Sequence, residues 1–402
     1  MNKTSLYAAL DIGATKICCL VAEGSYSGEL RIQKTGIAPS VGFNQGVLDN
    51  PGEVREAILQ AMEATGHSFR DETSTPLYLG VTSRNIRGTQ ALATWSSSRY
   101  GGKFIVSQKE MSSALAACQP TPDSNTRILH VIPRGYTVNG STTQYPLGQR
   151  TNSLKVESHV VLAGASHIDR LLTTVGDAGG KVKGLILDSL ASAEVVLRAD
   201  EKELGVALVD IGGEISSLAM FKRGAAYHTS VIPIGGRHFT NDLTLALDIS
   251  TEDAEEAKLK YGHVNPDGTM DSTRKVDLGR PGRGIQIAQG EIFRFLRERS
   301  EDLIRQISRR IREAGMSRMS HMPPSGIVLT GGGANLRGLD QLAQERLRCP
   351  VRVGIPNLSS LLPKELKDPA FATVVGLLLC GIRKPYRPAE IKRDRWPWQF
   401  MA

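Results

Sequence analysis

The stretch that decides the fold is residues 6–16, LYAALDIGATK, an apolar strand that ends in an Asp-Ile-Gly turn. A second stretch of the same design lies at residues 206–216 and reads VALVDIGGEIS. Glycine lets the backbone approach phosphate oxygens with no Cβ in the way, and its permissive φ lets N–H groups point at an anion. One such phosphate-binding hairpin in each half of the chain predicts a nucleotide held in a cleft between two domains.

The residue types in these hairpins suggest individual roles. An aspartate repels phosphate, so Asp11 and Asp210 are predicted to hold one Mg²⁺ ion between them, largely through water. Lys16 supplies a compact positive charge for a β- or γ-phosphate. The other expected nucleotide contacts come from the turns themselves: Gly13, Ala14, Thr15, Gly212, Gly213 and Glu214.

A third glycine turn supports the same interpretation. Residues 327–335, IVLTGGGAN, place Gly331, Gly332, Gly333 and Asn335 after an apolar strand, before a helix predicted to begin near Leu336. A purine or a ribose can lie against such a backbone, and a helix N-terminus favours phosphate. The alternative is a tight strand-to-helix connection. Neither GxGxxG nor GxxxxGK[ST] occurs, so the dinucleotide and Walker A motifs are excluded.

Composition places the chain among ordinary globular proteins. It has 402 residues, 40% hydrophobic and 22% charged, enough for two or three domain-sized units. The net charge of +8 fits a basic surface as well as an anionic partner. Five cysteines without metal-ligand spacing suit a reducing cytoplasm, and Cys18 and Cys19 are expected to be buried. The longest apolar run, residues 370–382, is shorter than the ~20 residues of a membrane span.

The pattern along the chain is a βαβ alternation interrupted by an insertion. Helices are predicted over residues 53–62, 168–178, 189–198, 251–261, 291–314 and 369–382, and buried strands over 77–81, 182–187 and 327–330. Residues 83–163 are richer in Ser, Thr, Gly and Arg, with short strands and one helix at 108–118. This segment is predicted to be an inserted α+β subdomain, and residues 263–284 a polar, glycine-rich connection.

These motifs resemble those of a known superfamily. DIGATK (11–16), DIGG (210–213) and LTGGGA (329–334) are similar to the two phosphate motifs and the adenosine motif of the actin, sugar-kinase and heat-shock-chaperone ATPases. Glu255 and Lys258 resemble the pair that flanks the adenosine. Within the superfamily, HVIPRGYTVNG (130–140) and DPAFATVVGL (368–377) look like the bacterial cell-division actin family FtsA, and the likeness runs from about Leu6 to Pro385.

The resemblance implies an α/β, actin-like (ribonuclease H-like) fold, with two domains around a nucleotide cleft and an FtsA-type inserted subdomain. Its expected divisions are subdomain IA at 1–82, 164–200 and 370–388, and subdomain IC at 83–163. Subdomain IIA is expected at 201–241 and 323–369, and subdomain IIB at 242–322. Residues 389–402 form a basic-aromatic tail.

The resemblance also implies a function. The family binds Mg-ATP, polymerises through subdomains IC, IIA and IIB, and tethers FtsZ filaments by binding the FtsZ C-terminal tail through subdomain IIB. It recruits later divisome membrane proteins at midcell, on the cytoplasmic face of the bacterial inner membrane, as a peripheral protein. No nucleic-acid partner is expected. The alternatives are a pilus-assembly scaffold of the same superfamily and a small-molecule kinase.

A kinase needs a general base to deprotonate its substrate hydroxyl. The nearest candidate is Asp242, in the segment TND (240–242) that resembles prokaryotic actins. Asp188 is the candidate for orienting a hydrolytic water, although a helix-capping role fits it as well. We therefore expect at most a slow Mg-dependent ATPase.

The ending of the chain departs from the family pattern of a flexible linker and an amphipathic membrane helix. Pro397 breaks any helix there, and the segment is short for an independent one. Basic and aromatic residues nevertheless favour an anionic headgroup zone. A weak membrane anchor is therefore predicted, and the alternative is a tail without membrane affinity. The anchor would be formed by Arg393, Arg395, Trp396, Trp398 and Phe400.

Overall fold

The structure is a computed structural model of the full chain. It describes residues 5–24, 30–44, 46–69, 75–96, 102–121, 123–264, 272–278, 285–314, 322–358 and 362–383. The five tail residues predicted to form a membrane anchor lie outside this part. Within it, no helix combines the length and the apolar character that crossing a membrane requires.

Two five-stranded sheets of the same design form the centre of the molecule. The first has the order β13-β6-β1-β2-β3 and the second the order β16-β15-β14-β19-β20. In each, an antiparallel meander of three strands is followed by two strands parallel to its first. The bounds are β1 Ser5–Ile12, β2 Lys16–Gly24, β3 Leu30–Pro39, β6 Leu77–Val81, β13 Val182–Leu187, β14 Val206–Ile211, β15 Ser216–Lys222, β16 Ala225–Ile232, β19 Ile327–Thr330 and β20 Val351–Val353.

The central strands are buried on both faces, which explains their continuous apolar sequences. In β14, Val206 and Leu208 belong to the core shared with the first half, whereas Ala207 and Val209 face the core of the second half. The predicted strands at residues 77–81, 182–187 and 327–330 are confirmed. All five cysteines are buried and free, as predicted for Cys18 and Cys19.

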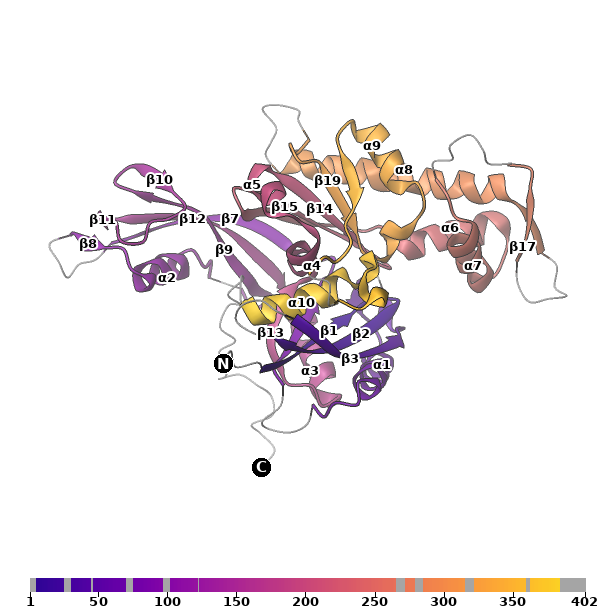
Figure 1. The fold of residues 1–402 in the computed structure, drawn as a ribbon, viewed down its shortest axis with the longest axis horizontal. Coiled ribbons are helices and arrows are strands. Elements are labelled where there is room, and N and C mark those ends of the chain that lie inside the picture. Colours follow the sequence, from indigo (N-terminus) through magenta and orange to yellow (C-terminus); the bar gives the residue numbers. More distant parts are fainter. Residues whose placement is uncertain are drawn as a thin grey trace.

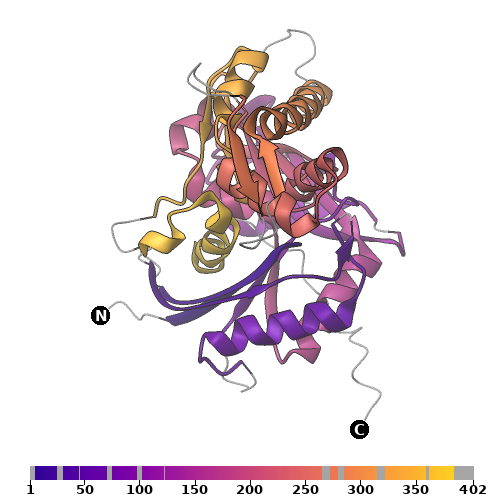
Figure 2. The same cartoon turned by 90° about the vertical axis from the view of Figure 1, so that its right-hand side faces the viewer.

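Two helices lie between the sheets and join the halves: α4 (Asp188–Val196) and α10 (Ala372–Arg383) (Figure 1). They approach closely at Gly376, where an added Cβ would come 2.0 Å from the Ala191 carbonyl oxygen. On the opposite face of the first sheet lie α1 (Pro51–Ala64) and α3 (Ala165–Asp177). Figure 2 shows α1 running beneath the strands of this sheet.

The insertion forms its own sheet, which projects from one side of the molecule (Figure 1). Its strand order is β10-β9-β12-β7, and α2 packs on it around a separate core. Short strands were predicted throughout the insertion, but β9 is a continuous strand of 13 residues. The bounds are β7 Arg87–Trp95, β8 Phe104–Ile105, α2 Gln108–Ala117, β9 Thr126–Val138, β10 Ser141–Thr143, β11 Arg150–Thr151 and β12 Leu154–Gly164.

Helices cover the outer face of the second sheet and extend to the other side of the molecule (Figure 1). The long helix α8 buries one apolar stripe that includes Leu296, Leu303 and Ile307. The bounds of these elements are α5 Ala199–Leu204, α6 Gly236–Leu247, α7 Thr251–Tyr261, β17 Lys275–Leu278, β18 Ile285–Ala288, α8 Gln289–Glu313 and α9 Leu339–Leu347. The remaining short elements are β4 Phe43–Asn44, β5 Val47–Leu48 and the 3₁₀ turns η1 Gly332–Asn335, η2 Lys364–Leu366 and η3 Pro369–Phe371.

Three sequence predictions are corrected. The helix after the third glycine turn begins at Leu339 and not near Leu336, because Gly338 takes φ +81°, which interrupts helical geometry. The helix predicted to reach Arg198 ends at Val196, since Leu197 is extended. The segment 263–284, predicted as a connection, contains β17, which pairs with β18 just beyond it.

Candidate functional site

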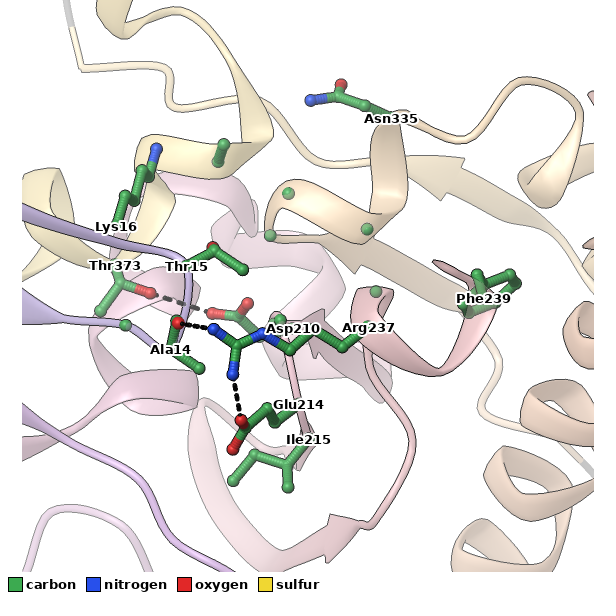
Figure 3. Close-up of a pocket in the computed structure, with 18 of the residues that line it drawn as sticks. Ala14, Thr15, Lys16, Asp210, Glu214, Ile215, Arg237, Phe239, Asn335 and Thr373 are labelled. Carbon is green, nitrogen blue, oxygen red and sulfur yellow. Dashed lines mark hydrogen bonds and ion pairs between the residues drawn. The ribbon is translucent and has the colours of Figure 1, made fainter. Parts of the chain in front are cut away.

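A cavity of about 400 Å³ lies where the two sheets face each other. All sixteen residues predicted from the sequence as catalytic or nucleotide-binding line it, although they come from five separate parts of the chain. Figure 3 shows several of them converging on this space. The sixteen are Asp11, Gly13, Ala14, Thr15, Lys16, Asp188, Asp210, Gly212, Gly213, Glu214, Glu255, Lys258, Gly331, Gly332, Gly333 and Asn335.

The two phosphate hairpins have the same closed turn and touch each other. The Gly13 N–H donates to the Lys16 carbonyl, and the Gly212 N–H to the Ile215 carbonyl, both at 3.0 Å. A Cβ added to Gly213 would lie 2.7 Å from Cγ2 of Thr15. The absence of a side chain at Gly213 therefore lets the two hairpins pack this closely.

Three carboxylates are buried beneath the hairpins. Burial raises the pKa of Asp11 to about 7, although Lys16 opposes this shift. Burial, together with the charges of Asp11 and Asp210, raises the pKa of Asp188 well above its usual value. One Asp188 oxygen has no hydrogen-bond partner within the described residues. So much desolvated negative charge favours protons or a cation at this position.

Asp210 is held by two hydroxyl groups that the sequence analysis missed. Ser192 in α4 donates to its Oδ2 at 2.7 Å, and Thr373 in α10 donates to the same atom at 3.0 Å. These bonds lower the pKa of Asp210, but burial outweighs them and the net shift is upward. The two helices between the sheets therefore fix the carboxylate of the second hairpin.

The Lys16 side chain extends toward Phe371, which directly precedes α10. Its Nζ lies 3.5 Å from the centroid of the Phe371 ring, a cation–π contact. Burial lowers the pKa of Lys16, whereas the nearby Asp11 raises it. The ammonium group therefore lies against Phe371 at the cavity wall.

An ion pair between Glu214 and Arg237 lies where the two hairpins meet (Figure 3). The Glu214 side chain is almost fully buried. The same guanidinium donates to the Ala14 carbonyl in the first hairpin at 2.7 Å. Sequence analysis did not assign a role to Arg237, although its place directly after the glycine pair at 235–236 was a usable signal.

The third glycine turn packs directly on the second hairpin. Gly331 has φ +80°, and a Cβ there would lie 2.3 Å from Oδ1 of Asp210. Asn335, at the end of this turn, donates to Asp368 at 3.0 Å. The turn therefore forms a bare backbone wall of the cavity.

Glu255 and Lys258 tie α7 to the start of α6. Lys258 donates to the Gly236 carbonyl at 3.1 Å, to the Thr240 hydroxyl at 2.8 Å and to Glu255 at 2.7 Å. Its ammonium is therefore saturated by protein oxygens, and the two side chains reach the cavity as a pair.

Asp242, the nearest candidate for a kinase base, does not line the cavity. Both its oxygens accept hydrogen bonds from Arg299 in α8, at 2.6 and 2.8 Å. Among the described residues, no three His, Cys, Asp or Glu side chains come together as a direct metal-binding group. The cavity carboxylates fit a cation held through water better than one held by the protein alone.

Comparison with known proteins identifies the family. The chain is 31% identical over 393 residues to the cell division protein FtsA of Pseudomonas aeruginosa, covering 94% of this chain and 90% of that protein. It is also 31% identical to FtsA of Bacillus subtilis, over 95% of this chain and 85% of that protein. The chain belongs to the FtsA family.

Two family models match the chain. The model described as cell division protein FtsA matches residues 207–376, and that of the SHS2 domain inserted in FtsA matches residues 85–162. The second match lies inside the segment 83–163, for which an insertion was predicted. The function of this FtsA chain therefore lies in cell division.

Solved structures confirm the actin-like fold. A PilM–PilN type IV pilus biogenesis complex matches with a TM-score of 0.65 at 18% identity, over 94% of this chain and 98% of that one. MreB5 of Spiroplasma citri, bound to ADP, matches with a TM-score of 0.56 at 13% identity, over 95% and 97%. Because these identities are low, the matches show the fold alone, and the pilus-scaffold alternative gains nothing from them.

Proposed function

We propose that this FtsA chain binds Mg-ATP in the cavity between its two halves and uses the nucleotide to control polymerisation. The observation that carries the proposal is the meeting of both phosphate hairpins and the third glycine turn around one cavity. The backbone N–H groups of the hairpins would bind the phosphates, and the glycine turn would receive the adenosine. A structure of the actin-like MreB5 of Spiroplasma citri contains AMPPNP, which supports this assignment by analogy of fold.

Asp11 and Asp210 would hold the Mg²⁺ through water, with Asp188 beneath them. The partnerless Asp188 oxygen and the raised pKa values of these groups fit a cation at this position. The ion would neutralise phosphate charge when bound. The protein's own part is to keep the Asp210 carboxylate fixed, through Ser192 and Thr373.

Turnover is proposed to be slow. Asp242, the nearest candidate for a general base, is paired with Arg299 and does not line the cavity. The role of the nucleotide is then to set subunit conformation. This is also why the kinase alternative is not retained.

The proposed partners are FtsZ, further copies of the chain, later divisome proteins and the anionic inner face of the bacterial membrane. FtsZ would dock through its C-terminal tail on residues 242–322, and copies would associate through residues 83–163 and the second half. These assignments rest on membership of the FtsA family.

A pull-down with an immobilised FtsZ C-terminal peptide tests the central partner. We expect retention of the purified chain by this peptide and none by a scrambled peptide of the same composition. Equal retention on both peptides, or on neither, would remove the FtsZ-tethering role. The actin-like fold would stand in either case.

A further inference from the structure

Arg237 belongs to the second half but reaches across to the first. Its backbone N–H donates to the Gly213 carbonyl at 2.7 Å, which fixes it against the second hairpin. Its guanidinium then donates to Glu214 and, at 2.7 Å, to the Ala14 carbonyl at the tip of the first hairpin. One side chain thus joins both phosphate hairpins (Figure 3).

Glu214 is anchored from the first half as well. Its Oε2 accepts the Gly46 N–H at 2.7 Å, in the turn between β4 and β5. Gly46 has φ +70°, and a Cβ there would lie 2.7 Å from Cδ1 of Ile215, so this turn packs tightly over the second hairpin. The carboxylate is therefore held on one side by Gly46 and on the other by Arg237.

The electrostatics of this arrangement differ from those of an ordinary ion pair. A carboxylate at the tip of a phosphate hairpin repels a phosphate, so Glu214 alone would oppose nucleotide binding. Arg237 neutralises it and remains partly exposed to the cavity, at 36% of its side-chain surface. Its second acceptor, the Ala14 oxygen, is a neutral carbonyl, and a phosphate oxygen is a stronger acceptor for guanidinium.

We propose that Arg237 is a specificity-determining residue that recognises the terminal phosphate of a nucleoside triphosphate. In the observed arrangement it joins the hairpins through Ala14. A terminal phosphate that reaches the hairpin tips takes the place of this carbonyl as the second acceptor of the guanidinium. This inference rests on the proposed nucleotide binding and deepens it.

The position of the Arg237 guanidinium explains why it would recognise the terminal phosphate and not an inner one. Arg237 lies where the two hairpins meet, whereas Asn335, at the end of the glycine turn, lies apart from it in the cavity (Figure 3). A nucleotide with its adenosine on the glycine turn extends its phosphates toward the hairpins. The triphosphate therefore reaches further toward Arg237 than the diphosphate does.

Titration calorimetry with Mg-AMPPNP and Mg-ADP tests the inference. Arg237→Met is expected to weaken AMPPNP binding about tenfold and ADP binding by less than about threefold, because it removes a charge-assisted contact to the last phosphate. Glu214→Gln is expected to strengthen AMPPNP binding about threefold, since it removes a competing negative charge and keeps an oxygen for Gly46. Arg237→Lys should lie between wild type and Arg237→Met.

The pair formed by Arg352 and Glu201 is a matched control. It has the same exposure of the arginine, 36%, a buried glutamate, and a further bond from the guanidinium to the Val196 carbonyl at 2.8 Å, but it does not line the cavity. Arg352→Met should lower the unfolding temperature without changing the ratio of AMPPNP to ADP affinity. Unfolding temperatures of all variants show whether a loss of binding is a loss of folding.

The two variants are expected to change AMPPNP affinity in opposite directions. A purely structural ion pair between Arg237 and Glu214 would instead lower the affinity in both variants. If Arg237→Met keeps the wild-type affinity ratio, or if Glu214→Gln weakens AMPPNP as much as Arg237→Met does, the inference is overturned and the nucleotide site stands. If the wild-type chain binds neither nucleotide, the proposed function fails and the inference fails with it.

Discussion

At the scale of single residues, buried histidines link the insertion to the second half. His159 in β12 contacts the Thr229 hydroxyl in β16 through Nε2 at 3.0 Å, and Gln90 lies 3.4 Å from its Nδ1. Burial, with smaller contributions from His228 and Arg134, lowers the pKa of His159 to about 3. The folded protein therefore keeps this imidazole neutral under conditions in which the unfolded chain protonates it.

The sign of the resulting pH dependence follows from linkage. Between pH 6.5 and about 3 the unfolded state binds the proton and the folded state does not, so stability is lost as the pH falls. From pH 7 to pH 5 this one group should cost about 2 kcal/mol of the free energy of unfolding. His159→Gln is expected to reduce the pH dependence by that amount, measured by urea unfolding at both pH values. His67→Gln would be a poor comparison, because this half-buried ring also packs on Phe69.

His130→Gln provides the better comparison within the same sheet. Burial lowers the pKa of His130 to about 4, and its Nε2 accepts the Leu187 N–H inside the first half. Its loss should also flatten the pH profile, but without loosening the insertion from β16. An unchanged slope in His159→Gln would show that this imidazole is not the group that acid protonates.

At the scale of elements, the contact between α4 and α10 positions the site. Ser192 and Thr373, which hold Asp210, lie on these two helices. The helices can approach this closely because Gly376 has no side chain facing Ala191. The packing of these helices therefore both joins the two halves and fixes Asp210, which is proposed to hold Mg²⁺ through water.

Gly376→Ala should destabilise the protein by roughly 1–3 kcal/mol, because its Cβ would overlap the Ala191 carbonyl and force the helices apart. Chemical unfolding measures this cost. Gly52→Ala in α1 is the control, since a Cβ there meets no atom closer than 3.5 Å and removes a flexible residue from a helix. Equal stability of the two variants would contradict the tight packing of α4 on α10.

Some of these elements were predicted correctly from the sequence pattern and others were not. The strand-turn-strand hairpins depend on neighbouring residues, so apolar runs and glycines predicted them correctly. The helix start after residue 335 was wrong, because Gly338 adopts a left-handed conformation that periodicity does not reveal. The β17–β18 pair was not predicted because each strand has only four residues, too few for a clear alternating pattern.

At the scale of the whole molecule, the two sheets close on a cavity while the insertion and the α6–α8 region extend to opposite sides (Figure 1). Such an outline leaves both extensions available to other molecules, in line with the proposed assembly through these regions. The proposed membrane anchor adds a weak contact to each subunit. Weak contacts become effective when many subunits bind together.

The basic-aromatic tail is expected to affect how the whole chain binds to anionic vesicles. The full chain should co-sediment several-fold more with anionic vesicles than a version ending at Lys392, because each basic residue contributes on the order of 1 kcal/mol near such a surface. Neutral phosphatidylcholine vesicles and raised salt should abolish the difference. Equal pelleting of both versions would leave the tail without a membrane role.

The sequence by itself determined the two hairpins and the third glycine turn, because these features depend on local backbone chemistry. The tertiary structure brings the sixteen predicted residues to one cavity. Only the tertiary structure showed that Arg237 bridges the hairpins, that Ser192 and Thr373 hold Asp210, and that Arg299 removes Asp242 from consideration as a base. Each of these is a contact between segments far apart in the chain, and its geometry is set by the packing of helices against sheets rather than by any neighbouring residue.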